Sequence, residues 1–332
     1  MIFVRVRFLL IVLAVVVSAA FGRAEVNQVT NIAPGVYFHE GDLKGRGHCN
    51  NGWIIFNDYV LVIDGNFPSG AQDIIPKIKA ITDKPVRFVF DTHHHGDHSY
   101  GNRVWVENGA TPVAHVGVVE EMKKYENGYY AGKTGRWENS AKDRPDVAAS
   151  KLTPPSLLFE KKLIFDDGKH RVELLHLGVA HTHGDAFAWL PNEKILFTGD
   201  ACVNGPYNYA GDGDTGAWIK TLEAAKRLGA RIVCPGHGSL GSADLLSEQQ
   251  SYFVELRKLV RKQAHQKPEE IRAAMDDIKT ALQKQQRIAR YVGDFLPTQI
   301  EKICVEMGAK PFLKSAALDE HEQHARAPIA QR

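Results

Sequence analysis

The chain has 332 residues, of which 44% are hydrophobic and 24% are charged, and its formal net charge is +2. This is ordinary globular composition, with enough length for one large domain and an appendage, or for two domains. The near-neutral charge provides no basic field of the kind that attracts nucleic acid, so we exclude nucleic acid as a partner.

Residues 1–24 have the pattern of a secretory signal peptide. Arg5 and Arg7 precede an apolar run at 8–21, and small residues follow it. We therefore expect a periplasmic or secreted protein. An uncleaved anchor is the alternative, but the run is shorter than the about 20 residues that a span needs. Cleavage would remove Arg5, Arg7 and Arg23 and no acid, so the net charge becomes +2 − 3 = −1. No other long apolar run follows, and we expect no stable membrane association after cleavage.

Apolar periodicity predicts alternating strands and helices up to residue 126. The strands are expected at 36–38, 52–57, 60–63, 86–90 and 113–114, and the helices at 69–81 and 116–126. The strand–helix–strand unit in this series indicates a parallel pair. Residues 127–156 then mix Gly with Tyr129, Tyr130 and Trp137, which predicts a long loop. Its aromatic side chains either line a substrate cleft or pack into the core.

The second half of the chain returns to strands and ends in helices. Strands are expected at 161–165, 171–177, 186–190, 194–198 and 231–234, with helices at 216–228, 244–266, 268–291 and 296–307. Ser242 is the expected N-cap of the helix at 244–266. We interpret residues 243–312 as a helical appendage and 313–332 as a loose tail. The appendage is a packing buttress, a surface for homo-oligomerisation or a substrate lid.

Four potential metal ligands follow the strand at 86–90: His93, His95, Asp97 and His98. His93 and His95 are two residues apart, so in an extended chain they point the same way. Gly96 allows a sharp turn, after which Asp97 and His98 can face the same point. Imidazole and carboxylate are ligands of Zn²⁺-type ions, and this set has room for two. The alternatives to a metal site of this kind are a polar loop that is rich in histidine and a metal-storage tract.

Three downstream motifs complete a known pattern. They are Gly178 to Asp185 with His181 inside, Phe197 to Asp200, and Pro235 to Gly238 with His237 inside. Together with the first motif they resemble, in order, the signature of the metallo-β-lactamase superfamily of hydrolases, over roughly residues 30 to 240. The resemblance implies a four-layer αβ/βα sandwich for residues 25–242, where periodicity alone gives only a mixed α/β class.

The resemblance also implies the ligand set and the chemistry. The first metal would be held by His93, His95 and His181, the second by Asp97, His98 and His237, and both by the bridging Asp200. It implies two Zn²⁺ per chain and a metal-bridged hydroxide that cleaves a C–O, C–N or C–S acyl bond in a small-molecule substrate, as a β-lactamase does. Asp97 and Asp200 are the expected catalytic residues. His183 is a rival ligand to His181, Asp185 an expected support of this loop, and His94 should point away from the metals.

The substrate and the activity stay open at this point. A bridging Asp200 departs from the true β-lactamases of this fold, where a Cys ligand or a small residue stands. Export and the stretch Gly96 to Asn102 favour a β-lactam. Acyl-homoserine lactonases are expected to carry a Tyr three residues after the bridging Asp, where this chain has Val203. One alternative is a mononuclear-iron persulfide dioxygenase using His93, His95, His181 and Asp200. Another is a non-enzymatic, metal-stabilised binding protein.

Export also permits oxidation of the cysteines. Cys202 and Cys234 each lie close in sequence to an expected ligand, so they either form a disulfide or pack as buried thiols.

Overall fold

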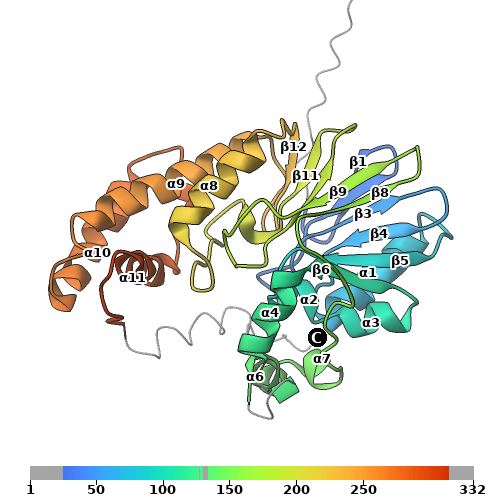
Figure 1. Ribbon diagram of the computed structural model, residues 1–332, viewed down its shortest axis with the longest axis horizontal. Coiled ribbons are helices and arrows are strands. Elements are labelled where there is room, and N and C mark those ends of the chain that lie inside the picture. The colour runs from blue at the N-terminus through green and yellow to red at the C-terminus, as the bar shows by residue number, and fades with distance from the viewer. Residues whose placement is uncertain (1–24, 127, 130–133, 314–332) are drawn as a thin grey trace, which may run out of the picture.

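The computed structural model describes residues 25–126, 128–129 and 134–313. The predicted signal peptide, Tyr130 and residues 314–332 lie outside the described residues. Two β-sheets pack face to face, with helices on both outer sides (Figure 1). The mixed α/β class and the four-layer sandwich predicted from the sequence are therefore confirmed.

The first sheet has seven strands in sequence order, from β1 to β7. They are β1 (Val29–Ala33), β2 (Val36–His39), β3 (Asn51–Ile55), β4 (Val60–Ile63), β5 (Val86–Asp91), β6 (Thr111–His115) and β7 (Leu157–Phe159). The first four strands pair antiparallel, and β4 pairs parallel with β5, as the strand–helix–strand pattern predicted. Strands β1 and β7 were not predicted, because neither alternates between buried apolar and exposed polar residues: β1 is partly buried or exposed throughout, and two of the three apolar residues of β7 are exposed.

The second sheet has five strands in the order β12-β11-β10-β9-β8. They are β8 (Lys162–Asp166), β9 (Arg171–Leu175), β10 (Phe187–Leu190), β11 (Ile195–Phe197) and β12 (Ile232–Cys234). The inner faces of the two sheets form one core, in which Phe38 and Ile54 of the first sheet meet Leu174 and Phe197 of the second. Gly52 permits this approach, because a Cβ there would lie 2.1 Å from the ring of Phe197.

Helices α1 (Pro68–Lys79), α2 (Gly96–Ser99) and α3 (Asn102–Glu107) belong to the first half of the chain. Ile74 and Ile78 of α1 pack with Trp105 of α3 on the outer face of the first sheet. On the other side, α8 (Thr215–Lys226) and α9 (Asp244–Arg261) cover the second sheet, where Trp218 meets Phe253 at a ring-centroid distance of 4.4 Å.

Among the described residues, the predicted long loop at 127–156 contains helices α6 (Arg136–Asp143) and α7 (Pro145–Ala148), which follow α4 (Val116–Tyr125). These helices are short and polar, so they lack the long apolar series on which the sequence interpretation relied. Trp137 is buried against Tyr100, with ring centroids 4.7 Å apart, while Tyr129 is 49% exposed. One of the described aromatic residues therefore packs into the core and the other faces solvent.

The C-terminal helices share the hydrophobic core of the second sheet. Helices α10 (Pro268–Gln283) and α11 (Leu296–Glu306) pack against α9, and all three contribute to the cluster that contains Trp189 and Leu196 (Figure 1). The predicted helix at 268–291 ends at Gln283, because a tight turn at Gln285 follows and leads into a 3-10 turn at Ala289–Tyr291. The N-cap of α9 is Ala243 rather than Ser242, which lies one residue earlier and accepts from the Asp244 amide at 3.2 Å.

All four cysteines are buried free thiols. Cys202 packs in the cluster outside the second sheet, whereas Cys234 packs in the cluster between the sheets. A disulfide between them is therefore not formed, and the two residues act as small apolar side chains. Within the described ranges, no helix is long and apolar enough to span a membrane.

Candidate metal centre

Strand β5 places the first ligand motif at the edge of the core. Its last residues, Val89 to Asp91, are buried, and the chain leaves the sheet at Thr92 and His93. His95 is the N-cap of α2 in an extended conformation, and Asp97 and His98 lie within that single helical turn. The tight turn allows consecutive side chains to face one point.

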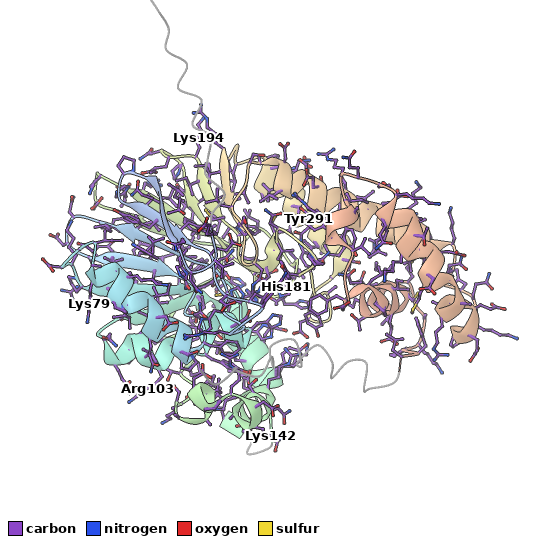
Figure 2. All side chains as sticks on the ribbon, turned by 180° about the vertical axis from the view of Figure 1, so that it is seen from behind. Lys79, Arg103, Lys142, His181, Lys194 and Tyr291 are labelled. Atoms are coloured by element: carbon purple, nitrogen blue, oxygen red, sulfur yellow. The ribbon has the colours of Figure 1, made fainter. Side chains whose placement is uncertain are left out.

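The three histidines predicted for the first metal lie together. His93, His95 and His181 can each offer a ring nitrogen within 4.8 Å of the other two. Nδ1 of His95 lies 2.9 Å from Nε2 of His181, although they come from opposite sheets. Figure 2 shows His181 near the middle of the molecule, between the sheets and the C-terminal helices.

The three residues predicted for the second metal form an adjacent group. Oδ2 of Asp97 lies 3.1 Å from Nε2 of His237 and 3.4 Å from Nε2 of His98. The two histidine nitrogens are 3.4 Å apart. His98 is completely buried, and His237 is nearly so.

Asp200 lies between the two groups. Its Oδ2 is 3.2 Å from Nε2 of His237 and 3.7 Å from Nε2 of His181, and its Oδ1 is 3.4 Å from Nε2 of His98. Gly236 makes room for this carboxylate, because a Cβ there would lie 2.0 Å from Oδ1. One carboxylate therefore faces the candidate ligands of both metals.

Hydrogen bonds on the far side of each ring fix its tautomer. His95 donates from Nε2 to Asp212 at 2.8 Å, and His181 donates from Nδ1 to the carbonyl of Tyr209 at 2.7 Å. Thr92 donates its hydroxyl to Asp64 at 2.8 Å, so it accepts from Nδ1 of His93 at 3.1 Å. All three histidines therefore turn a lone pair toward the common point.

This lone-pair arrangement fits a cation. Two imidazole nitrogens that both lack a proton face each other at 2.9 Å in His95 and His181. Nε2 of His93 is buried and has no hydrogen-bond partner among the described residues. Such convergence of unpaired acceptors is costly unless a positive ion takes their lone pairs. The donor set, imidazole with carboxylate, suits zinc.

The electrostatics of the second group also favour positive charge. Burial alone would raise the pKa of Asp200, but facing His237 and His98 holds it well below its ordinary value. Burial alone would lower the pKa of His237, but Asp200 and Asp97 raise it to about 9. The carboxylates are therefore ionised and draw cations to this point.

Asp64 and Asp212 support the site and were not singled out from the sequence. Asp64 accepts from the backbone and the hydroxyl of Thr92 and lies 3.0 Å from Nδ1 of His98. Its φ of 66° is in the left-handed region, which a residue other than glycine occupies at a cost that functional sites often carry. Asp212 lies in a glycine-rich loop without periodicity. No sequence signal connects it to His95.

The other residues singled out from the sequence do not belong to either ligand group. His94 points away from the two groups and lies 3.6 Å from Asp212. His183, the rival ligand, is exposed. Asp185 accepts from the backbone and the hydroxyl of Thr182 at 2.9 and 2.6 Å, so it fixes the loop that carries His181.

A family model described as the metallo-beta-lactamase superfamily matches residues 45–237. This range covers more than half of the chain and contains all seven candidate ligands. The chain belongs to the metallo-beta-lactamase superfamily. Helices α9 to α11 lie beyond the range that matches this superfamily.

Two curated relatives are called metallo-beta-lactamase type 2. The protein from Bacteroides fragilis is 38% identical over 107 residues, which are 30% of this chain and 43% of the relative. The protein from Pseudomonas aeruginosa is 33% identical over 82 residues, 24% of this chain and 32% of the relative. The chain therefore spans less than half of the length of the curated superfamily members that it matches.

Solved structures of the superfamily share the fold. A metallo-beta-lactamase from Pontibacter korlensis gives a TM-score of 0.55 at 21% identity, covering 68% of this chain and 98% of that chain. The crystal structure of the DIM-1 metallo-beta-lactamase exposed to ceftazidime gives a TM-score of 0.54 at 19% identity, covering 69% of this chain and 96% of that chain. At this level of identity, these similarities show the fold alone.

Proposed function

We propose that this protein is a di-zinc hydrolase that cleaves a C–O, C–N or C–S acyl bond of a small-molecule substrate, in the manner of a β-lactamase. The observation that carries the proposal is the position of Asp200. Its two oxygens lie within 3.7 Å of His181, His98 and His237, so both ligand groups meet at one carboxylate. A site for a single structural metal has no need of a second complete group.

In this proposal, His93, His95 and His181 would hold the first zinc, Asp97, His98 and His237 would hold the second, and Asp200 would serve both. Bound zinc would lower the pKa of water from about 16 to about 7 and act as a Lewis acid toward the scissile carbonyl. No serine or cysteine nucleophile is then required. The far-side contacts of His95 and His181 keep their lone pairs aimed at the metal before the substrate arrives.

Besides serving as a ligand of the second zinc, Asp97 would orient the nucleophile that attacks the substrate. Its carboxylate is 20% exposed, more than that of Asp200 at 6%, so it lies on the open side of the site. Burial opposes its charged form, but His98 and His237 hold its pKa well below the ordinary value. An ionised carboxylate at the mouth of the site can accept a hydrogen bond from the nucleophile and direct it to the substrate.

A β-lactam is the first substrate class to test. The curated relatives carry the name metallo-beta-lactamase, and the predicted signal peptide would take the protein to the periplasm or the exterior, where β-lactams arrive. The bridging Asp200 keeps esters, lactones and thioesters as the next classes. Tyr207 and Tyr209 lie beside the metal ligands, with ring centroids 6.0 Å from His237 and 5.8 Å from His95, and offer apolar walls to any of these substrates.

The test is hydrolysis of a chromogenic cephalosporin, followed by aryl esters, lactones and thioesters, by zinc-loaded protein. Turnover that a chelator abolishes and added Zn²⁺ restores supports the proposal. Asp97→Asn removes the orienting charge, and Asp166→Asn, at an exposed edge of the second sheet, is the control that keeps activity. Protein that binds two zinc ions and hydrolyses none of the four classes would contradict an acyl hydrolase.

A further inference from the structure

Arg136 reaches a metal ligand through one intermediate carboxylate. It is the first residue of α6, and its Nη1 and Nη2 donate to Oδ2 and Oδ1 of Asp212 at 2.6 and 3.0 Å. The same Oδ2 accepts from Nε2 of His95 at 2.8 Å. Three residues from separate parts of the chain thus form one continuous chain of charge-assisted hydrogen bonds.

This cluster is not a third metal site. His94, His95 and Asp212 lie close enough to hold an ion by distance alone. The guanidinium of Arg136, however, already donates to both oxygens of Asp212 and lies 3.4 Å from Nε2 of His94. The positive charge that this group of side chains accommodates is therefore that of the arginine.

Arg136 is held in place from two other directions. Its guanidinium lies 3.8 Å over the ring of Tyr125, the last residue of α4. The next residue, Trp137, donates its backbone N–H to Glu126 at 2.7 Å, and Glu126 also accepts from Tyr100 at 2.5 Å. The guanidinium is therefore also positioned by contacts other than its hydrogen bonds to Asp212.

Helix stability does not explain an arginine at this position. A cation at the N-terminus of a helix opposes the helix dipole. The pairing with Asp212 compensates for this. The Asp212 side chain is only 4% exposed, and it accepts hydrogen bonds from His95 at 2.8 Å and from Arg136 at 2.6 and 3.0 Å. Without the guanidinium, this buried carboxylate would lose its paired positive charge, which is costly.

We propose that Arg136 is a positioning residue for the first metal. By holding both oxygens of Asp212, it fixes the orientation of His95 and keeps Nδ1 of that ring aimed at the point that His93 and His181 share. Helix α6 thereby contributes to metal affinity without contacting the metal. The inference rests on the proposed function, because it requires zinc at the three-histidine group.

The experiment measures zinc affinity and does not depend on turnover. Metal-free wild-type, Arg136→Ala, Arg136→Lys and Arg171→Ala proteins are titrated with Zn²⁺ against a chromophoric chelator, and thermal unfolding of each metal-free protein is recorded. Arg171 is the matched control, because it pairs with Asp166 and Glu173 at the start of β9, away from the ligands. A lysine keeps the charge but cannot hold both carboxylate oxygens in a planar fork.

We expect Arg136→Ala to weaken one of the two zinc-binding steps by about 10-fold, the lower end for loss of an outer partner of a ligand. Arg136→Lys should lie between Ala and wild type, and Arg171→Ala should bind as wild type does. Affinities within threefold of wild type in Arg136→Ala would overturn the inference. It would also be overturned if both steps weakened together with a lower unfolding temperature of the metal-free protein. A wild-type protein that binds fewer than two zinc ions would instead overturn the proposed function.

Discussion

Oδ2 of Asp200 lies 3.7 Å from Nε2 of His181, so Asp200 connects the first group of candidate ligands to the second. Asp200 follows β11 and His181 follows β9, both in the second sheet. The remaining members of the first group follow β5 of the first sheet. The centre therefore lies where strand ends of both sheets meet, and its geometry depends on how the sheets pack.

Replacing Asp200 with Asn should reduce the metal content from two ions per chain to one. The amide preserves the volume but removes the negative charge that faces both ligand groups, so at least one ion loses a ligand. Metal analysis after dialysis against a weak chelator gives the stoichiometry. Retention of two ions by Asp200→Asn would show that this carboxylate is not shared.

Replacing Asp97 with Ala should lower kcat for the substrate that the protein hydrolyses, by about 10²- to 10⁴-fold, the usual contribution of a group that handles the reacting proton. The side chain is 20% exposed and contributes little packing, so the unfolding temperature should change little. Steady-state kinetics and thermal unfolding are measured on the same preparation. Unchanged turnover would remove Asp97 from the mechanism.

The ligand set could be proposed from the sequence because it is carried by compact local motifs. The four ligands of the first motif fall between His93 and His98. Their spacing along an extended segment and a turn already indicates that their side chains converge. His181, Asp200 and His237 came from the order of motifs in a known superfamily. The periodicity of the chain does not predict that these three residues lie beside the first motif.

Apart from Asp185, the residues that orient the ligands could not be predicted. Asp64, Asp212 and Arg136 are single polar residues whose role depends on three-dimensional proximity. Arg136 lies in a region that looked like a loop, because α6 has only one buried residue and no apolar series. A hydrogen bond from the backbone N–H of Trp137 to Glu126, which lies outside the helix, holds its N-terminus.

Phe253 tests whether the C-terminal helices are part of the core. Its side chain is fully buried and packs on Trp218 of α8. Phe253→Ala should lower the free energy of unfolding by about 3–5 kcal/mol, the usual cost of such a truncation in a core. The neighbouring Val254 is 48% exposed, and Val254→Ala is the control with an effect within about 0.5 kcal/mol. Denaturant titration compares them, and equal effects would mean that the helices add little stability.

His115 should make the folded state sensitive to acid. Its Nδ1 accepts from the amide of Gly117 at 3.2 Å and caps α4, which requires the neutral ring. Burial first, and then His176 stacked 3.9 Å away, lowers the pKa of His115 to about 4. The unfolded chain therefore binds more protons between pH 6.5 and about 4, so this contribution to stability is lost as pH falls through that window.

His115→Asn removes this titration and keeps an oxygen acceptor for the cap. We expect the unfolding free energy of the variant to depend less steeply on pH between about 6.5 and 4 than that of the wild type. Urea titrations of metal-free protein at several pH values provide the comparison. Parallel pH profiles would show that the pKa of His115 is the same in the folded and the unfolded chain.

The most direct test of the central claim is the metal content and metal identity of the purified protein, measured by elemental analysis against protein concentration. The two ligand groups joined by Asp200 predict two zinc ions per chain. One iron per chain would contradict this account and favour the mononuclear-iron dioxygenase alternative, which uses only His93, His95, His181 and Asp200.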